Sequence, residues 1–410
     1  MPLSLVEYPT HERWRDRSVV RLHDGLLHYG GLVPSLTEYL DVRAHRYSNR
    51  EAVVELGGTR LTYRELWTSA SRIAGGLQQH GIGYGDRIAI VFPNGVRWVQ
   101  AFLGALLSGA VPVPVNVALG SAEVERLLAD SEPDYVLDDE LPDGLPFIDD
   151  GACLSELAVL CYTRGIGEPA RGVELSNENI LSAIETVVHD EQLTCDGIRN
   201  LMMLPLAHAS GCVNQLLPTF AVGGTVVLDP ALDTDLMSTI EREHIDVVTG
   251  TTNDYVRKVA QRTGVADAGR VRRISCNGGR FGDAEAAQLR TTFPTAQLWS
   301  WSGSTETSGI GLALSDECAQ THPGSAGIAC GGMELALYGP DAEVGRGELL
   351  CRGPNIMRGY WRDPETTARK FTGNWFHTGD FAEIDGEGFV RMVGPAASVE
   401  QATAKPAHSA

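Results

Sequence analysis

The chain has a deficit of basic residues. It carries 33 Lys and Arg against 53 Asp and Glu, which gives a formal net charge of −20 at pH 7. A surface of this sign repels the phosphates of DNA and RNA, so the charge argues against nucleic-acid binding. We expect the acidic side chains to form a solvated surface that keeps the protein soluble. The charge places no limit on small-molecule substrates.

Long apolar segments are also missing. No stretch approaches the roughly 18 apolar residues without charge that a membrane-spanning helix needs, so no membrane association is expected. The first eight residues lack the basic, apolar and small-residue regions of a secretory signal. The prediction from these absences is a soluble protein of the cytoplasm.

The cysteines do not form a pattern that indicates a metal site or a disulfide framework. The sequence has no Cys-x-x-Cys pair, and its eight cysteines are scattered, at positions 153, 161, 195, 212, 276, 318, 330 and 351. Because thiols stay reduced in the cytoplasm, we expect free and mostly buried cysteine side chains rather than disulfides or a zinc site.

The length of 410 residues suggests two or three domains. Thr62-Tyr-Arg-Glu65 has the capping-box pattern and begins an amphipathic helix that Gly81 closes. The apolar run over 87–92 then predicts a buried strand. Further predicted elements are a helix over 96–108 and strands over 111–115, 225–228, 245–249 and 273–275. The alternation of strands and helices predicts a layered α/β architecture with mostly parallel sheets.

The character of the sequence changes near Gly324. Beyond it, short strand-like runs separated by Gly and Pro, such as 333–338 and 347–352, predict a small β-barrel subdomain. We therefore divide the chain into an N-terminal extension (1–32), α/β subdomains (33–324), a β-rich subdomain (325–393) and a flexible tail (394–410). The tail is small, polar and Pro-containing, so no packed core is expected there.

A segment rich in glycine, with hydroxyl and cationic side chains, runs from Tyr162 to Asn179. In phosphate loops, glycines let backbone N–H groups approach phosphate oxygens, hydroxyls add donors, and a cation neutralises charge. The segment resembles the phosphate loop of the AMP-forming acid ligases, the adenylate-forming enzymes of the acyl-CoA synthetase type. The resemblance assigns Thr163, Gly165, Arg171 and Gly172 to phosphate binding, and it places Arg171 among the catalytic residues.

Four positions of this loop depart from the family pattern. The usual Ser, two Thr and one Gly are replaced by Arg164, Ile166, Gly167 and Glu168. The carboxylate of Glu168 would repel a triphosphate. Taken alone, the segment also fits an ordinary surface turn.

Two further segments follow in the order that the family has. Leu204-Pro-Leu-Ala-His208 resembles the Leu-Pro-x-x-His stretch in which a ring lines the acyl pocket, so the resemblance makes His208 a candidate catalytic residue. A lone His is otherwise usually structural. The pair Gly278-Gly279 is similar to a family turn where glycines let the backbone pass close to the adenine and the acyl group.

The segment from Leu298 to Gly309 resembles the family motif Asn-x-Tyr-Gly-x-Thr-Glu. The Gly, Thr and Glu of the motif are present as Gly303, Thr305 and Glu306. The resemblance implies that Thr305 contacts the α-phosphate and that Glu306 holds Mg²⁺, a hard cation that prefers oxygen ligands; both are candidate catalytic residues. Ser302 stands where the family has a tyrosine that packs on the adenine, which predicts reduced or altered nucleotide affinity.

The longest near-exact resemblance spans residues 347–361 and 375–380. At its end, Asp380 matches the acidic residue that hydrogen-bonds both ribose hydroxyls, a role that suits a carboxylate with two acceptor oxygens. The alternative is that Asp380 only orders a turn. Together the segments identify the chain as similar to this family over residues 33–394, with ATP (AMP) and Mg²⁺ as the implied cofactors.

The resemblance ends after Gly394. The family continues with an Arg that reaches the ribose and with a C-terminal domain whose Lys assists adenylation, whereas this sequence has Pro395 and small residues. Loss of such a cation costs several kcal/mol at a transition state, so we expect slow adenylation and impaired thioester formation by the chain alone. A partner protein, or the intrinsic Arg171 or Arg280, is a candidate replacement for that Lys.

Two hypotheses about function follow. In the first, the chain activates a small-molecule carboxylic acid with ATP as an acyl-adenylate, in specialised metabolism, and passes the acyl group to an amine, hydroxyl or thiol, with a partner or carrier protein as a candidate acceptor. In the second, it is a descendant that no longer adenylates; it binds an acyl or adenylate ligand as a partner protein, or catalyses an acyl transfer or cyclisation without ATP.

Overall fold

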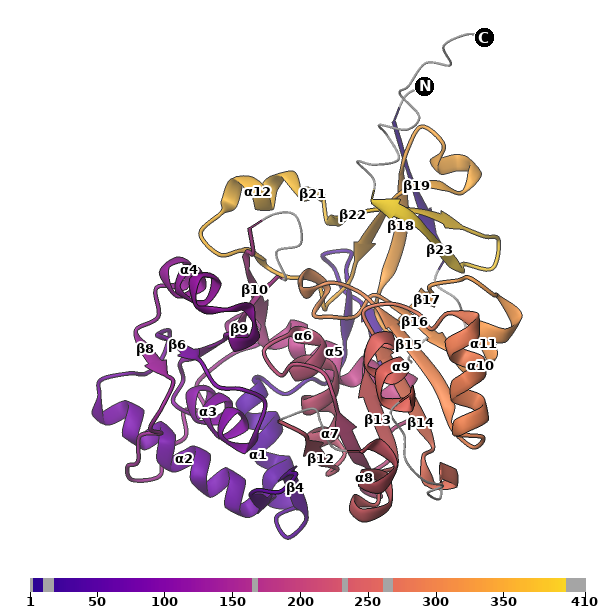
Figure 1. Cartoon of the computed structure of the whole chain (residues 1–410). Coiled ribbons are helices and arrows are strands. Elements are labelled where there is room, and N and C mark those ends of the chain that lie inside the picture. The colour runs from indigo at the N-terminus through magenta and orange to yellow at the C-terminus, as the bar shows by residue number, and fades with distance from the viewer. Residues whose placement is uncertain (1–2, 10–17, 164–168, 231–234, 261–267, 396–410) are drawn as a thin grey trace.

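The computed structural model of the chain describes residues 3–9, 18–163, 169–230, 235–260 and 268–395. Its centre is a nine-stranded sheet (Figure 1). The five neighbouring pairs from β15 to β4 are parallel, and antiparallel pairs close both edges. In order across the sheet the strands are β17 (Ile328–Ala329), β16 (Leu312–Ser315), β15 (Gln297–Ser302), β14 (Arg273–Asn277), β13 (Val247–Gly250), β11 (Arg199–Met202), β12 (Thr225–Leu228), β4 (Glu51–Glu55) and β5 (Arg60–Thr62).

Helices accompany this sheet as the alternating pattern predicts. Strands such as β12 and β13 are buried along their whole length, as expected for parallel strands covered on both faces. The helices are α1 (Leu36–Arg46), α5 (Asn177–Asp190), α6 (Ala209–Gly211), the π-helical turn η3 (Cys212–Leu216), α7 (Leu217–Ala221), α8 (Leu236–Glu243), α9 (Thr252–Ala260), η4 (Ala268–Arg270), α10 (Asp283–Thr292) and α11 (Asp316–Thr321). The predicted layered α/β class is confirmed.

A second layer contains the predicted helix pair. Helix α2 (Tyr63–Gln79) begins at Thr62, and both halves of the capping box with Glu65 are present. It packs against α3 (Val96–Leu107) beside a small parallel sheet. The sheet has the order β7 (Val111–Pro114), β6 (Arg87–Ile90) and β8 (Tyr135–Leu137), with η2 (Val117–Leu119) and α4 (Ser121–Ser131) following β7.

A three-stranded antiparallel sheet flanks the loop segment singled out in the sequence. Strands β9 (Leu157–Tyr162) and β10 (Gly172–Ser176) pair on either side of residues 163–171, and β20 (Gly359–Tyr360) pairs with β10. The last pairing brings a segment almost 200 residues further along the chain to the base of the loop.

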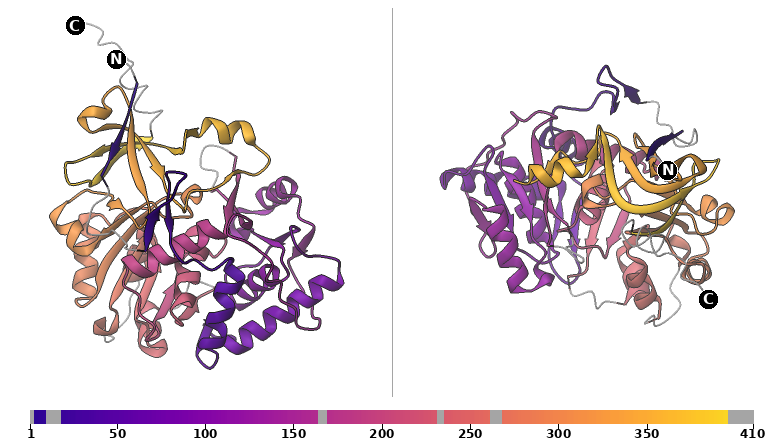
Figure 2. Two further views of the ribbon diagram at one scale, coloured as in Figure 1. Left: turned by 180° about the vertical axis from the view of Figure 1, so that it is seen from behind. Right: turned by 90° about the horizontal axis from the view of Figure 1, so that it is seen from above.

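The C-terminal part forms a six-stranded antiparallel sheet on one end of the layered body, as the views of Figure 2 also show. The N-terminal strand β1 (Ser4–Tyr8) belongs to it and pairs with β18 from Ser4↔Gly339 to Tyr8↔Leu335. The other members are β18 (Glu334–Gly339), β19 (Arg346–Arg352), β22 (Trp375–Ile384), β21 (Phe371–Thr372) and β23 (Val390–Pro395); η6 (Ala342–Val344), α12 (Pro364–Arg369) and the hairpin β2 (Val19–Arg21)–β3 (Leu27–Tyr29) complete the elements.

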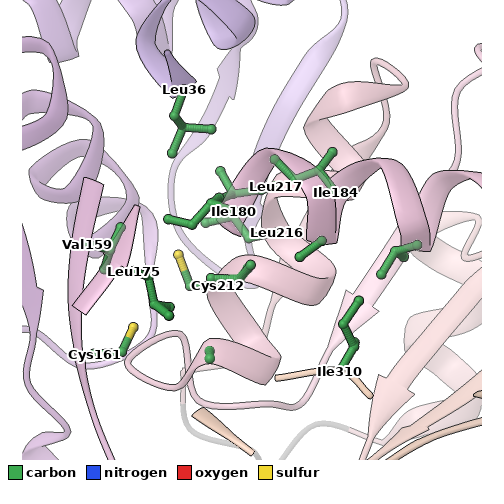
Figure 3. Packing of buried hydrophobic residues seen from close by; sticks show 14 of the residues in the cluster. Leu36, Val159, Cys161, Leu175, Ile180, Ile184, Cys212, Leu216, Leu217 and Ile310 are labelled. Atoms are coloured by element: carbon green, nitrogen blue, oxygen red, sulfur yellow. The ribbon is translucent and has the colours of Figure 1, made fainter. Parts of the chain in front are cut away.

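The largest buried cluster joins these parts. Figure 3 shows Ile180 of α5 close to Leu217 of α7 and facing Leu175 and Val159 of the three-stranded sheet, with Ile184 farther along the helix. Six of the eight cysteines are buried free thiols; Cys153 and Cys195 are exposed. Within the described ranges, no helix combines the length and apolar character needed to cross a membrane.

Candidate functional site

Two adjoining hollows lie where the sheets meet. Their volumes are about 250 Å³ and about 480 Å³, and they share Gly278, Gly303, Ser304 and Thr378 as lining residues. Strands β14 and β15 of the nine-stranded sheet end at these hollows, which is the edge where open α/β sheets bind ligands. Most of the residues singled out in the sequence line one hollow or the other.

A tight turn after β15 presents Thr305 and Glu306 to the larger hollow. Gly303 is required there because a Cβ atom would lie 2.7 Å from the backbone of Ile310. Thr305–Thr307 forms the short 3₁₀ helix η5, which Ser304 caps. The chain thus turns within a few residues, and the side chains of Thr305 and Glu306 face the larger hollow.

A buried asparagine fixes this turn from behind. The side-chain amide of Asn355 donates to the backbone carbonyls of Thr307 (3.0 Å) and Ile310 (3.1 Å). The backbone carbonyl of Asn355 accepts from the hydroxyl of Ser308 (2.8 Å). The backbone N–H of Met357 donates to the carbonyl of Glu306 (2.8 Å). The segment before β20 therefore determines where Thr305 and Glu306 stand.

Glu306 is linked to the phosphate-loop candidates through Tyr360. The hydroxyl of Tyr360 donates to Oε1 of Glu306 at 2.7 Å. The guanidinium of Arg171 lies over the same ring, 5.7 Å from its centroid, within reach of a cation–π attraction. Arg171 and Thr163 are also joined, since the backbone N–H of Arg171 donates to the hydroxyl of Thr163 at 3.0 Å. All four side chains line the larger hollow.

One of the described phosphate-loop candidates, Gly172, does not line either hollow. Gly172 is buried in β10, where a Cβ atom would meet the Cβ of Trp361 at 2.9 Å, so its place in the structure is one of close packing. Gly165 lies outside the described residues, as do the substituted positions 164 and 166–168.

The glycine pair after β14 separates the two hollows. Gly278 and Gly279 have positive φ angles of 86° and 148°, conformations that glycine adopts without steric cost. Both of their N–H groups donate to the carbonyl of Trp301 (3.1 and 3.3 Å). The indole N–H of Trp301 in turn donates to the buried carboxylate of Glu191 at 2.7 Å. Glu191 also pairs with Arg273 at 3.1 Å, so an ion pair holds this turn from beneath.

The smaller hollow has both polar and apolar lining residues. Its polar side chains are Ser302, Ser304, Thr307, Thr378 and Asp380, and Ser302 stands at the point where the family has a tyrosine. The rest of the lining is apolar or glycine: Gly278, Gly279, Gly303, Gly311, Leu312, Leu349, Cys351 and Met392. A hollow with this lining suits a ring with a hydroxyl-bearing group attached.

Asp380 lies in an environment that opposes its ionisation. Burial is the main cause that raises the pKa of its carboxyl above the usual value; the ammonium of Lys370 acts in the opposite direction, and the carboxylate of Glu348 adds to the increase. The backbone around it is fixed, because the hydroxyl of Thr378 donates to the carbonyl of Leu349 (2.7 Å) and accepts from the N–H of Asp380 (3.1 Å).

His208 also lines the larger hollow, and it is the residue directly before α6. The amide nitrogen of Asn116 lies 3.2 Å from its Nε2. The amide oxygen of Asn116 accepts from the backbone N–H of Ala118 (3.1 Å), which fixes the amide orientation. Since an amide N–H can only donate, this hydrogen bond uses Nε2 of His208 as its acceptor.

Glu306, the residue predicted to bind Mg²⁺, has few other potential metal ligands around it. Among the described residues, no group of three or more His, Cys, Asp and Glu side chains could hold a metal ion. This arrangement still fits Mg²⁺, because that ion is usually bound by one or two carboxylates with phosphate oxygens and water. Glu306 is the carboxylate in position for that role.

The structure adds residues that the motifs did not single out. Tyr360 lies within a quoted motif, but its bond to Glu306 depends on the pairing of β20 with β10. Lys370 lines the larger hollow from a segment with no motif. Asn214 is fully buried, and neither polar atom of its side chain has a hydrogen-bond partner in the part of the chain that the structure describes; its amide nitrogen lies 2.5 Å from where a Cβ on Gly309 would stand. Arg280, in contrast, lines a separate hollow of about 230 Å³.

Comparisons with known proteins agree with this geometry. The model of the family described as AMP-binding enzyme matches residues 40–361. The chain belongs to the AMP-binding enzyme family. A feruloyl-CoA synthase from an Amycolatopsis species is 32% identical over 387 residues, which cover 86% of this chain and 77% of that protein. An indoleacetate–CoA ligase from Aromatoleum aromaticum is 28% identical, with 88% and 78% covered.

A solved structure of the AMP-binding enzyme fold covers almost the same part of the chain. The N-terminal domain of FACL13 from Mycobacterium tuberculosis, solved with an inhibitor bound, superimposes with a TM-score of 0.79 at 26% identity. The match covers 88% of this chain and all of that domain. The family and fold predicted from the sequence motifs are confirmed, and the relatives of this chain are acid–CoA ligases.

Proposed function

We propose that the chain is an AMP-forming acid ligase that uses the two adjoining hollows as one site. The smaller hollow takes the nucleoside and the larger one takes the phosphates and the acid. The observation that supports this most directly is that Thr305 and Glu306, from one motif, and Asp380, from another, line two hollows that share lining residues.

The nucleoside fits the smaller hollow by shape and polarity. The backbone at Gly278 and Gly279 is open enough for a flat base to approach, and Leu312 and Met392 supply apolar surface. Among the polar side chains, Asp380 can accept hydrogen bonds from two ribose hydroxyls. Ser302 leaves the base without the tyrosine ring of the family pattern, so we expect the affinity for the base to be modest.

The phosphates fit the larger hollow by charge. The hydroxyls of Thr163 and Thr305 can donate to phosphate oxygens, and Arg171 supplies a permanent positive charge. Glu306 would hold Mg²⁺, which neutralises phosphate charge when bound. The hydrogen bond from Tyr360 orients the carboxylate of Glu306 for this task.

The proposed reaction joins the acid to the α-phosphorus of ATP. A carboxylate oxygen of the acid forms a bond to the α-phosphorus, the bond to the bridging oxygen of the β-phosphate breaks, and pyrophosphate leaves. Arg171 and Thr305 stabilise the negative charge on the phosphate oxygens. His208, which Asn116 contacts through Nε2, lines the acyl end.

The names of the relatives suggest the substrate class. Feruloyl-CoA synthase and indoleacetate–CoA ligase are both named for acids that carry an aromatic ring and for coenzyme A as the acceptor. We therefore propose an aryl or arylalkyl carboxylic acid as the first class to test, with a thiol as the acceptor.

Exchange of labelled pyrophosphate into ATP that depends on added acid tests this proposal. We expect exchange with a member of a panel of aryl acids, and a rate lower by on the order of 10²-fold in Glu306→Gln, because the metal ligand is weakened. Glu125→Gln is the matched control, since Glu125 is exposed on α4, away from both hollows. Nucleotide binding without exchange for any acid would contradict the ligase and favour the alternative of a binding protein that does not adenylate.

A further inference from the structure

Lysine is the scarcest charged residue of this chain. Only Lys258, Lys370 and Lys405 occur among the 33 basic residues. Lys258 is buried and lies 3.7 Å from the carboxylate of Asp229, and Lys405 is in the terminal segment outside the described residues. Lys370 is therefore the lysine that the structure places at the larger hollow.

The backbone of Lys370 is fixed between two elements. Its N–H donates to the carbonyls of Thr366 (3.1 Å) and Thr367 (3.0 Å) at the end of α12. Its carbonyl accepts from the N–H of His377 in β22 at 2.8 Å. Lys370 thus stands between α12 and β21; in Figure 1, α12 lies above β10 and leads into β21 and β22. Its side chain starts from a defined position.

The ammonium points along β22 toward the nucleoside end of the site. It lies 3.6 Å from where a Cβ atom on Gly379 would stand. Gly379 has a φ of 81°, and because it has no side chain it leaves space beside the ammonium of Lys370. The charge of Lys370 also acts on the adjacent Asp380. The cation therefore lies next to the carboxylate that we propose to hold the ribose.

Although its charge acts on Asp380, the ammonium of Lys370 makes no direct ion pair with a carboxylate among the described residues. Glu306 in the same hollow is bonded to Tyr360. The side chain is half-buried, so its charge is only partly solvated. A cation held in this way at a polar hollow attracts an anionic group.

We infer that Lys370 binds the phosphate nearest to the ribose, the α-phosphate of ATP and of the acyl-adenylate, in the hollow that Arg171 also lines. The inference rests on the proposed function. The α-phosphate is joined to the ribose through its C5′ atom, so a ribose held by Asp380 brings that phosphate to the hollow that Lys370 and Thr305 line. Lys370 and Arg171 would then both supply positive charge to one phosphate.

Calorimetry with AMP and adenosine tests the inference. In Lys370→Met, which keeps the length of the side chain and removes the charge, we expect the affinity for AMP to fall about tenfold and that for adenosine to stay unchanged. Lys370→Arg should keep most of the affinity for AMP. Arg46→Met, at an exposed residue of α1 that lines neither hollow, is the matched control for the loss of one positive charge elsewhere.

The possible results separate this inference from the proposed function. Equal binding of AMP by the wild type and Lys370→Met would overturn the inference alone. Equal losses for AMP and adenosine would show a structural role and would also overturn it. A wild type that binds no AMP would overturn both proposals.

Chemical labelling gives a second readout that does not need a variant. An amine-reactive acetylating reagent should modify Lys370 in the free protein, and AMP should protect it; peptide mass spectrometry measures both. Buried Lys258 is the reference for slow labelling. If saturating AMP leaves the reactivity of Lys370 unchanged, the ammonium does not bind the phosphate.

Discussion

Replacement of Asp380 by Asn should change stability and nucleotide affinity in opposite directions. Burial raises the pKa of this carboxyl, so the folded chain binds the proton more tightly than the unfolded chain does. Stability is then lost as the pH rises from the usual pKa of an Asp through the raised value. At pH 7 the ionised carboxylate is therefore unfavourable for folding, and the neutral Asn removes that penalty.

Binding should respond in the other direction. Hydrogen bonds to a charged group contribute about 1.5–3 kcal/mol each, so loss of the charge that accepts from the ribose hydroxyls should lower the affinity for AMP at least about tenfold. The two effects together distinguish a binding carboxylate from one that only orders a turn, because a structural carboxylate would lower stability when replaced.

Thermal unfolding and calorimetry measure the two effects. Without ligand, Asp380→Asn should unfold at a higher temperature than the wild type at pH 7, and the difference should shrink as the pH is lowered toward 4. With the wild type, 2′-deoxy-AMP should bind more weakly than AMP, and the variant should discriminate less between them. A variant that is less stable without ligand and binds AMP as well as the wild type would refute this account of Asp380.

Three further substitutions test the framework of the site by chemical or thermal unfolding. Gly303→Ala places a Cβ 2.7 Å from the backbone of Ile310, so it should destabilise the chain by about 1–3 kcal/mol; no loss would show that the turn can relax. Glu191→Ala leaves Arg273 without its partner in a buried network and should cost about 3–5 kcal/mol, whereas a neutral effect would contradict the support assigned to it. Asn214→Leu removes a buried amide that has no hydrogen-bond partner among the described residues and should stabilise by about 1–3 kcal/mol, so a loss of stability would mean that the amide is bonded in solution.

The elements with strong local signals could be predicted from the sequence. The capping box at Thr62 and Glu65, followed by apolar residues at helical spacing, gives α2 as the structure has it. The run at 225–228 is β12 residue for residue. In such segments capping and hydrophobic periodicity agree with the tertiary environment, so the local pattern is sufficient.

The pairings between distant segments could not be predicted in this way. Strand β1 joins the C-terminal sheet through β18, more than 320 residues away, and β20 is only two residues long. Neither has a periodicity that names its partner. The domain division made from composition, with residues 1–32 as a separate extension, does not contain this information.

The candidate site shows the same division. The motifs named Thr305, Glu306 and Asp380, but they did not show that Asn355 holds the turn of Thr305 and Glu306. The position of Lys370 at the hollow depends on where α12 ends and β22 begins. Interactions of this kind arise from the packing of separate elements, and a single sequence does not specify them.

The central claim is that the two hollows form one site for ATP, and titration of the wild-type chain with ATP and Mg²⁺ by calorimetry tests it most directly. We predict saturable binding at one site per chain, weakened by both Asp380→Asn and Glu306→Gln. The absence of any heat of binding with ATP, AMP or an acyl-adenylate analogue would contradict the account.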